Sequence, residues 1–563
     1  MADATPQVPL DATSKHSEFN KRFEEMKRHA ANYISSWKDL AQCIAPERGR
    51  FHESKPVLGV MQDHTLIIDG HATQSKNKSA SGLNSGITSK ARPWFMLKLG
   101  DDAQESIPGV REWLDEVQRR MRGVFESSNI YNTFQNTYEE LLTFATACFI
   151  VLQDFDSVIR TRFFTIGEYY LGIDKKGKVN AFARSFIMTT RQMVDNFGID
   201  NVSPQVQSYF NNNQMDQEIR IRHLIEPNDS RNLMMEDFRN MPYRSVYWEH
   251  KHQGGHFLET RGYKRFPVIA PRWKVPTTDV VYGHGPGWDA LGDVKELQKT
   301  KYDKLLAQEK LHNPPVQADS SITGHVNLLP GGVSRTSANV PNAGVRATYE
   351  VNPNLQSFIE GINESKKSID RHFFTDLFSM FASLDRRQIT AEEIIRREQE
   401  RVMLMGPVLN NLDEEMLGPV IELTYEIMSE NGLLPEAPPD IEGAEIKVKY
   451  ISIMAQAQRG LGLQSIERMI GFVGNASAVA PGIVDIIDWD EAGREAAEMG
   501  GIPAKLINDE DTVAQIRQDK QAQANNQIAM EAAASAADTS KKLSETEMGK
   551  DSALDRIMEG VAP

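Results

Sequence analysis

The sequence predicts an α+β protein that is mainly helical and contains more than one packed unit. Long segments repeat apolar residues at the spacing of one helix face, whereas several segments between residues 155 and 263 repeat them at every second residue, as strands do. The chain has 563 residues, and 40% of them are hydrophobic. That length and composition are sufficient for sizeable cores.

The overall composition excludes several classes of protein. The formal net charge is −15, which argues against a generic basic nucleic-acid binder. Only Cys43 and Cys148 are present, and both lie beside apolar residues, so neither a disulfide framework nor a cysteine zinc site is expected. No apolar run approaches the roughly 18 residues of a membrane span, and the first residues lack a signal-peptide core. We expect a soluble, cytoplasmic product without a membrane partner.

The N-terminal part is expected to be helical after a disordered segment, residues 1–15. Apolar residues at helical spacing predict four helices, at 19–44, 72–89, 109–125 and 130–149. The third helix starts at Pro108-Gly109, and the fourth ends in a nearly continuous apolar run.

A period of two follows and predicts strands. Asp174-Lys-Lys-Gly177 is a hairpin signal, and the returning strand covers 179–188. Two short helices come next, with Thr190 and Ser203-Pro204 as their N-terminal caps. Further strands are expected at 219–225, 245–251 and 257–263.

The stretch from residue 266 to residue 316 contains the longest predicted helix that follows a glycine-rich loop, and it joins the α+β part to the helices after it. It reads as a strand at 267–273, a loop with Gly283, Gly285, Pro286 and Gly287, and a long helix at 288–312 that Asn313-Pro314-Pro315 ends. A glycine-rich loop before a helix is either a phosphate cradle or a hinge. Pro286 has no backbone N–H, and the lysine of a P-loop is missing, so a hinge is favoured.

A non-helical insert at 317–349 separates this helix from a second amphipathic helix at 352–384. After a break at 383–388, a capping box at Thr390 and Glu393 starts a helix that kinks at Gly406 and Pro407 and resumes to 429. One strand at 445–451 and helices at 464–472, 490–499 and 513–537 complete the chain.

Two polar clusters are candidate sites. His250, His252 and His256 with Glu249 offer imidazoles to a metal, but convincing further ligands are missing, so an exposed hairpin is favoured. Arg386 and Arg387 lie in the break between two helices, either as a solvated loop or as a basic loop facing a polyanion. No motif of a zinc protease, a serine hydrolase or a kinase is present.

Several stretches together resemble the portal (head-to-tail connector) proteins of short-tailed bacteriophages. In chain order they are SGLNSGITSKARPWF (81–95), IGEYYLGIDKKGKV (166–179), FPVIAPRWKV with VVYGHGPGWDAL (266–291), RRQITAEEIIRREQE (386–400) and LMGPVLNNLDEEMLGPVIE (404–422). Residues 190–209 match loosely, and Ile389 stands where methionine is expected. The resemblance extends from about residue 15 to about residue 455.

The resemblance implies a portal fold with a wing, a stem, a clip and a crown that assembles as a ring. The implied division is a disordered N-terminus (1–15), wing (16–283), first stem helix (284–312), clip (313–351), second stem helix (352–382), tunnel loop (383–389), further wing (390–458), crown or C-terminal helical region (459–540) and flexible tail (541–563). Gly283, Gly285, Pro286 and Gly287 would be the hinge between wing and stem. Arg386, Arg387 and Gln388 would lie in the DNA channel.

The resemblance also implies the function. Such a protein forms a ring, usually of twelve copies, at one capsid vertex of the virion, after assembly in the host cytoplasm. It is the channel for packaging and ejection of double-stranded DNA. The implied partners are the terminase, the major capsid and scaffolding proteins, the tail adaptor or tail tube, and internal core proteins; no enzyme activity and no cofactor are implied. Two alternatives stay open, a tail or adaptor ring protein and a nucleotide- or metal-dependent enzyme that uses the loop from Gly283 to Gly287.

Overall fold

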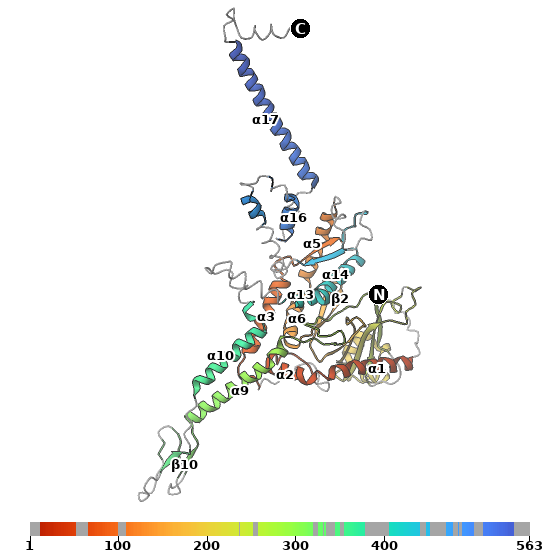
Figure 1. Cartoon of the computed structure of the whole chain (residues 1–563). Coiled ribbons are helices and arrows are strands. Elements are labelled where there is room, and N and C mark those ends of the chain that lie inside the picture. The colour runs from red at the N-terminus through yellow and green to blue at the C-terminus, as the bar shows by residue number, and fades with distance from the viewer. Residues whose placement is uncertain are drawn as a thin grey trace, which may run out of the picture. The chain divides into compact units, whose positions relative to one another are not determined.

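The structure is a computed structural model of the whole chain (Figure 1). It describes residues 12–51, 66–99, 109–235, 237–250, 257–318, 325–329, 332–333, 344–348, 354–377, 405–439, 446–450, 469–476, 482, 487–499 and 510–544. The chain divides into two compact units, Met1–Leu461 and Gly462–Pro563.

The first unit begins with helices α1 (Ala12–Ala31), α2 (Ile34–Ile44), α3 (His71–Ile87), α5 (Val110–Ser127) and α6 (Ile130–Phe144). The single helix expected at 19–44 is wrong, because the chain turns at residues 32–33. This turn lets the Tyr33 ring stack on Trp37, with centroids 5.5 Å apart, and contact Tyr282 at 5.2 Å. Helix α1 also starts at Ala12, inside the segment that was expected to be disordered.

The helix expected at 130–149 is too long. Helix α6 ends at Phe144 because Ala145 adopts a left-handed backbone conformation, with φ at 62°. The apolar run that follows belongs to strand β2 (Cys148–Asp154), which lies between β3 (Val158–Phe164) and β9 (Val268–Ile269). A continuous apolar run suits a central strand as well as a buried helix, so periodicity alone could not separate them.

The main sheet has five antiparallel strands in the order β4-β5-β6-β7-β8. Their bounds are Tyr169–Ile173, Val179–Thr189, Glu218–Pro227, Tyr243–Glu249 and Glu259–Tyr263. The β4–β5 turn confirms the hairpin signal, since Asp174 Oδ1 accepts hydrogen bonds from the backbone N–H groups of Lys176 and Lys178. The strand expected at 267–273 is shorter, because only Val268–Ile269 forms β9.

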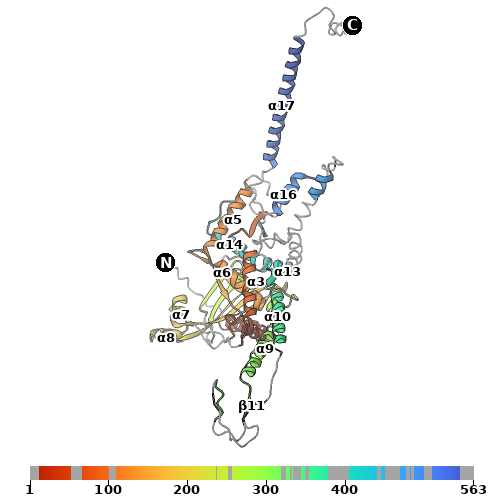
Figure 2. The same ribbon diagram turned by 90° about the vertical axis from the view of Figure 1, so that its left-hand side faces the viewer.

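Helices α7 (Thr190–Phe197) and α8 (Pro204–Asn211) lie between β5 and β6 in the sequence. Figure 2 shows the two helices next to each other. The cap of α8 is Ser203, as expected. The cap of α7 is Thr189 and not Thr190: its side chain accepts from the N–H of Gln192, whose side chain accepts from the N–H of Thr189. This reciprocal pair is a capping box.

The two faces of the five-stranded sheet pack differently. Helix α1 covers one face, where the guanidinium of Arg222 lies 4.3 Å from the Phe23 ring and that of Arg244 lies 4.6 Å from Phe19. On the other face, Met193 and Val206 of the short helices form a small second core with Ile221 of β6.

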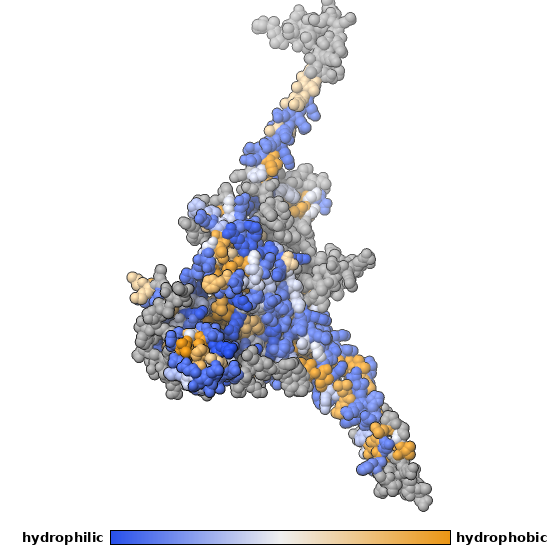
Figure 3. All heavy atoms as spheres, turned by 180° about the vertical axis from the view of Figure 1, so that it is seen from behind, coloured by the Kyte–Doolittle hydropathy of each residue, from blue (hydrophilic) through white to orange (hydrophobic). Residues whose placement is uncertain are grey.

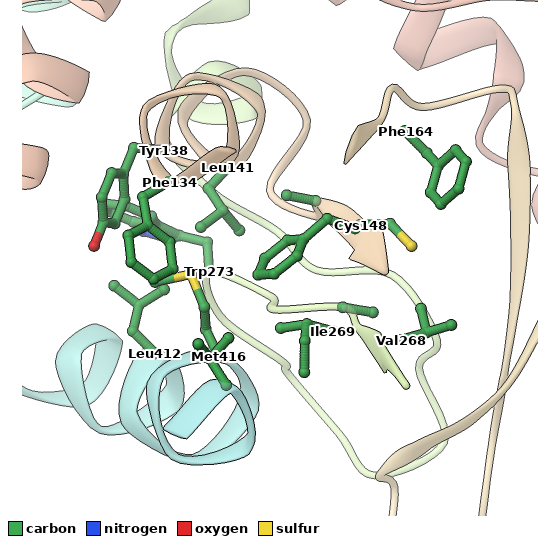
Figure 4. Packing of buried hydrophobic residues seen from close by; sticks show 14 of the residues in the cluster. Phe134, Tyr138, Leu141, Cys148, Phe164, Val268, Ile269, Trp273, Leu412 and Met416 are labelled. Atoms are coloured by element: carbon green, nitrogen blue, oxygen red, sulfur yellow. The ribbon is translucent and has the colours of Figure 1, made fainter. Parts of the chain in front are cut away.

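The large core of the first unit lies where α6, β2 and β9 meet (Figure 4). Phe134, Tyr138 and Leu141 of α6 point toward Leu412 and Met416 from the chain after residue 405 (Figure 4). Segments almost 300 residues apart in the sequence therefore share one core, so both belong to the same packed body of the first unit.

After residue 405 the chain forms α13 (Gly406–Leu412), a π-helical turn (Asp413–Leu417) and α14 (Gly418–Glu430). Gly406 is the first residue of α13, Pro407 lies in its first turn, and residues 401–404 lie outside the described part of the chain. The irregularity that the structure describes in this helical segment is the π-helical turn at Asp413–Leu417, after the predicted kink position. Pro419 has no N–H to give to the carbonyl four residues earlier, which explains a widened turn just before it.

Strand β12 (Ile446–Tyr450) confirms the strand expected at 445–451, and it pairs with β1 (Phe95–Leu99), which the sequence did not reveal. In the second unit, α16 (Trp489–Met499) and α17 (Glu510–Ser544) agree with expectation. Arg517 holds Asp490 through two hydrogen bonds of 2.7 and 2.6 Å. Among the described helices, none is both long and apolar enough to cross a membrane.

Candidate functional site

The candidate site is a pair of long helices, α9 (Pro286–His312) and α10 (Leu355–His372), which lie side by side (Figures 1 and 2). They run antiparallel, because Asp293 near the start of α9 accepts from the Ser368 hydroxyl and lies 3.3 Å from His372 Nε2 at the end of α10. The predicted helix at 288–312 is therefore confirmed, with two more residues at its start. We call α9 and α10 the helix pair.

Helix α9 starts at a closely packed glycine loop. A Cβ atom added to Gly287 would lie 2.2 Å from the carbonyl oxygen of Thr143, and one added to Gly283 would lie 2.4 Å from that of Ala145. Gly285 faces Ala145 and Trp273, with a Cβ approach of 3.0 Å. The glycines thus let the start of α9 press against the end of α6. The junction is tight in this structure, so bending at the predicted hinge would have to separate these surfaces.

The same loop does not present a ring of free N–H groups for a phosphate. The N–H of Gly283 donates to Thr146 Oγ1 at 2.8 Å, and that of His284 donates to the carbonyl oxygen of Lys274 at 2.9 Å. Pro286 has no N–H, and it occupies the first helical turn, where proline is favoured. His284 instead contacts Asp289 at 2.8 Å. These contacts fit a structural junction better than a nucleotide cradle.

A polar network holds the base of the helix pair against the body. Gln298 of α9 accepts hydrogen bonds from the N–H groups of Ile68 and Asp69, at 2.8 and 2.9 Å, and donates to the carbonyl oxygen of Asp69 at 2.8 Å. The Asp69 carboxylate lies 2.9 Å from Lys366 of α10 and 3.6 Å from Lys301 of α9. One short segment before α3 therefore binds both helices.

Electrostatics keep the Asp69 carboxylate ionised. Burial alone would raise its pKa, but the hydrogen bonds from Lys366 and from the N–H of His71, with the charge of Lys301, lower the pKa below its usual value. Nearby, Asp370 of α10 accepts from the Ser75 hydroxyl at 2.6 Å and lies 3.1 Å from His71. The base is thus an ion-pair and hydrogen-bond network that joins α3, α9 and α10.

This network was not visible in the sequence. Asp69 lies in a polar loop and is more than 220 residues from its partners in the helix pair. One signal was available at Gln298, a polar residue one turn after Val294 on the buried stripe of α9. A buried glutamine needs hydrogen-bond partners, and such a position predicts a polar contact.

The outer part of the helix pair leaves apolar side chains in water. The apolar side chains of α9 are buried only as far as Leu297, whereas Tyr302 is 50% exposed and Leu305 48% exposed. Leu311 and Ile359 of the pair are also exposed. Figure 3 shows apolar surface interleaved with polar surface along this projecting part. Exposed apolar side chains of this kind are typical of a surface that binds another molecule.

The charges of the helix pair are balanced. Helix α9 carries as many lysines as carboxylates; these are Lys295, Lys299, Lys301, Lys304 and Lys310, with Asp289, Asp293, Glu296, Asp303 and Glu309. Helix α10 is balanced too, with Lys366, Lys367 and Arg371 against Glu360, Glu364 and Asp370. Such a surface gives no strong net attraction to a polyanion.

The second helix is shorter than expected. Asn354 caps α10 by accepting from the N–H groups of Gln356 and Ser357, and the helix ends at His372. The continuous helix expected at 352–384 is wrong, because Phe374 has φ at 58°, a left-handed conformation that interrupts a helix. Residues 378–404, with Arg386, Arg387 and Gln388, lie outside the described part of the chain.

The insert between the two helices contains a short hairpin. Strands β10 (Val316–Ala318) and β11 (Val345–Ala347) pair in antiparallel fashion. This agrees with the β-and-loop insert expected at 317–349. It also explains how the chain returns from the end of α9 to the start of α10.

Of the candidate histidine cluster, only His250 lies in the described part of the chain. The His250 side chain is largely exposed, and partial desolvation together with the charges of Arg222 and Arg220 lowers its pKa. Residues 251–256 are outside the described chain. Among described residues, no group of three or more histidine, cysteine, aspartate or glutamate side chains has a metal-binding arrangement.

Comparison with known proteins identifies the family. Residues 16–507 match the family described as bacteriophage head to tail connecting protein. The chain belongs to this family. It is 37% identical over 541 residues to the portal protein of Salmonella phage epsilon15, which covers 95% of this chain and 97% of that protein. It is 36% identical over 536 residues to the probable portal protein of Bordetella phage BPP-1, over 95% and 96% of the two chains.

Two solved structures are also similar to this member of the connector family. One is described as the neck of an empty gene transfer agent particle computed with C6 symmetry, with a TM-score of 0.30, 11% identity, and coverage of 74% of this chain and 91% of that one. The other is a virion of a native gene transfer agent particle, with a TM-score of 0.31, 11% identity, and coverage of 76% and 95%. At these TM-scores, the likeness is too weak to bear on the fold.

Proposed function

We propose that this connector-family chain is a portal protein. In this proposal, about twelve copies form a ring at one vertex of the capsid, and the helix pair lines or flanks a central channel for double-stranded DNA. The observation that carries the proposal is the match to portal proteins of two phages over 95% of the chain. The unpartnered apolar residues of the helix pair are the physical support, because neighbouring copies would cover them.

The dimensions of α9 agree with a channel wall. Its 27 residues form a rod about 40 Å long at 1.5 Å per residue. Twelve such rods side by side, at about 10 Å spacing, give a ring about 38 Å in diameter between helix axes. Subtracting a helix diameter of about 10 Å leaves a bore of about 28 Å. A B-form duplex is about 20 Å wide, so it passes with a margin.

The charge of the wall suits passage rather than binding. Each phosphate that a protein neutralises adds affinity, and a conduit that grips its DNA would slow it. The balanced charges of α9 and α10 avoid this. Within this proposal, residues 383–389 form a tunnel loop, and Arg386, Arg387 and Gln388 touch the DNA backbone without reading its sequence.

The remaining parts of the proposal concern domains and partners. In this proposal the wing comprises residues 16–283 and 390–458, the clip residues 313–351, the crown residues 459–540, and the flexible tail residues 541–563. Gly283–Gly287 joins wing to stem. The ring would dock the terminase during packaging, contact major capsid and scaffolding proteins, and later hold the tail adaptor and internal core proteins. The chain itself would catalyse no reaction, and it would assemble in the host cytoplasm before entering the virion.

Negative-stain electron microscopy and native mass spectrometry of the purified chain test this proposal. Closed rings of about twelve copies with a central hole support it. A monomer or dimer that hydrolyses ATP, or that needs a metal for an activity, would favour the enzyme alternative and overturn it. A ring that binds to finished tails but is missing from empty capsid precursors would favour an adaptor protein.

A further inference from the structure

A cavity of about 450 Å³ lies away from the helix pair, between strand β3, strand β5 and helix α7. Its walls combine arginines with apolar side chains, among them Arg162, Phe164, Arg184, Phe186 and Met188. Gln192 and Asn196 of α7 close one side. Neither the portal proposal nor the histidine cluster uses this cavity.

Arg184 is the unusual residue of the cavity. Its side chain belongs to β5 and is only 7% exposed. The guanidinium lies 4.2 Å from the Phe186 ring centroid and 4.9 Å from that of Phe164, so two aromatic rings hold it. Among the described residues, no carboxylate lies within ion-pair distance of it. A buried arginine without a carboxylate is rare, because its charge cannot be removed at ordinary pH.

A neutral histidine fixes the orientation of Arg184. The Nε–H of Arg184 donates to Nδ1 of His223 at 3.2 Å, and Nε2 of His223 lies 2.9 Å from the Ser245 hydroxyl. Burial, with the charges of Arg184, Arg162 and Arg261, holds the pKa of His223 well below its usual value, so its Nδ1 is free to accept. The His223 ring also stacks on Tyr247, with centroids 3.8 Å apart. The histidine therefore orients the arginine but does not neutralise it.

The rest of the cavity adds positive charge. Arg162 of β3 is exposed and has no carboxylate partner among the described residues; its guanidinium lies 5.7 Å from the Phe164 ring. Arg50 is paired with Glu168 at 2.5 Å. The side chains around the cavity thus carry three positive charges and one negative charge.

An uncovered strand edge forms one wall of the cavity. Strand β4 pairs with β5 only as far as Arg184, opposite Tyr169, whereas β6 pairs with β5 on to Thr189. The part of β5 from Ser185 to Met188 therefore has a neighbouring strand on one side only, and these residues line the cavity. Such an edge accepts an extended peptide by strand addition.

We propose that this cavity binds an acidic peptide segment, with an aspartate or glutamate carboxylate held by Arg184 and Arg162 and an adjacent apolar side chain packed against Phe164 and Phe186. A planar guanidinium binds a carboxylate through two parallel hydrogen bonds, and aromatic walls strengthen that contact by excluding water. We assign the peptide to a partner protein with an exposed acidic segment, because the arginines of the cavity are complementary in charge to such a segment.

The shape of the site favours a peptide over nucleic acid. A nucleic-acid backbone presents a row of phosphates and needs a stripe of basic groups along its path. Here two arginines that have no ion-pair partner among the described residues converge on one half-open cavity, and one carboxylate, Glu168, also lines it.

Fluorescence anisotropy tests this site on the purified, unassembled chain, independently of ring formation. The probe is a fluorescein-labelled peptide, Gly-Leu-Glu-Phe-Gly with both ends blocked, and its glutamine analogue is the control. We expect the analogue to bind at least roughly tenfold more weakly, because a hydrogen-bonded charge is lost. Arg162→Gln should weaken binding roughly five- to tenfold, since that side chain is exposed. Arg160→Gln, the matched loss of an exposed arginine two residues away on β3, should leave binding unchanged.

Arg184→Met keeps about the same side-chain volume and should abolish binding of the probe. Circular dichroism checks that this variant folds. If it does not fold, the binding measured for Arg162→Gln tests the proposal instead. Assembled rings that still bind the probe would support a partner protein as the source of the peptide. Rings that no longer bind it would overturn that source and assign the site to a neighbouring copy. Absence of probe binding at millimolar concentration, equal binding of the two peptides, or equal loss in Arg160→Gln would overturn the proposal. It would also be overturned if inorganic phosphate or a single-stranded oligonucleotide displaced the probe at lower concentration than unlabelled peptide.

Discussion

Gly287→Ala should destabilise the first unit by crowding the start of α9 against the end of α6. The added Cβ would lie 2.2 Å from the carbonyl oxygen of Thr143 and 2.9 Å from that of Leu142, both backbone atoms that cannot rotate away. Overpacking of this kind costs about 1–3 kcal/mol. We expect the upper end of that range, because α9 would have to shift along its contact with α6.

Gly292→Ala is the matched control on the same helix. Gly292 is exposed, and an added Cβ would have nothing within 4 Å. Alanine in a helix interior is more favourable than glycine by about 0.5–1 kcal/mol, so this variant should be slightly more stable than the parent chain.

Differential scanning calorimetry of the unassembled chain measures both variants. At about 2.1 cal/mol/K per residue, a 461-residue unit that unfolds cooperatively has an unfolding entropy of about 1 kcal/mol/K. Gly287→Ala should then lower the Tm by about 3 °C, and Gly292→Ala should raise it by about 0.5–1 °C. Equal shifts in the two variants, or no loss in Gly287→Ala, would refute the packed junction described here.

Three further predictions concern the helix pair and the loop beyond it. Asp69→Asn should lower the stability of the unassembled chain by about 1–2 kcal/mol at neutral pH, because Lys366 and Lys301 lose a charged partner. The pKa of Asp69 is lowered in the folded chain, so its contribution to the free energy of unfolding is present above the usual pKa of 3.8 and is lost as the pH falls through the lowered pKa. Urea unfolding of the parent and variant chains at pH 7 and pH 3 should therefore show a smaller stability difference at pH 3. Leu305→Ser should leave the Tm of the unassembled chain unchanged but weaken the affinity of each contact between copies about tenfold. Native mass spectrometry measures the fraction of chains in rings, and an unchanged fraction would show that this face is not part of the interface. Arg386→Ala with Arg387→Ala should leave rings intact but alter the length or yield of packaged DNA, and normal packaging by the double variant would remove both residues from the channel.

The long helix α9 could be predicted from the sequence because several local signals agree. Pro286 starts it, Asn313-Pro314 ends it, and the apolar spacing continues between them. The β4–β5 hairpin was predictable for the same reason, since a period of two and the Asp174–Gly177 turn support each other. The order of the five strands in the sheet came only from the structure. A segment's secondary structure can be predicted from sequence when its local signals agree in this way.

The missed boundaries depend on tertiary packing. Helix α6 stops at Phe144 because the following apolar run is needed as a central strand, and α10 stops before Phe374. In both places, the apolar pattern continues through the break. Periodicity reports burial, and it does not report which partner provides that burial.

The polar contacts at the base of the helix pair and in the arginine-lined cavity could not be predicted from the sequence. Asp69 meets Gln298 and Lys366 only after folding, and Arg184 meets His223 only through strand pairing. Composition gave the acidic balance of the chain. It could not show that Arg162 and Arg184 share one cavity and that neither has an ion-pair partner in the described part of the chain.

A cryo-electron microscopy map of the assembled protein, in which the rotational symmetry and the place of the helix pair can be measured, tests the portal proposal most directly. The proposal predicts a closed ring of about twelve copies, with α9 and α10 around an axial channel wider than the roughly 20 Å of a DNA duplex. No ring, a channel narrower than the duplex, or a ring with the helix pair pointing away from the axis would contradict it.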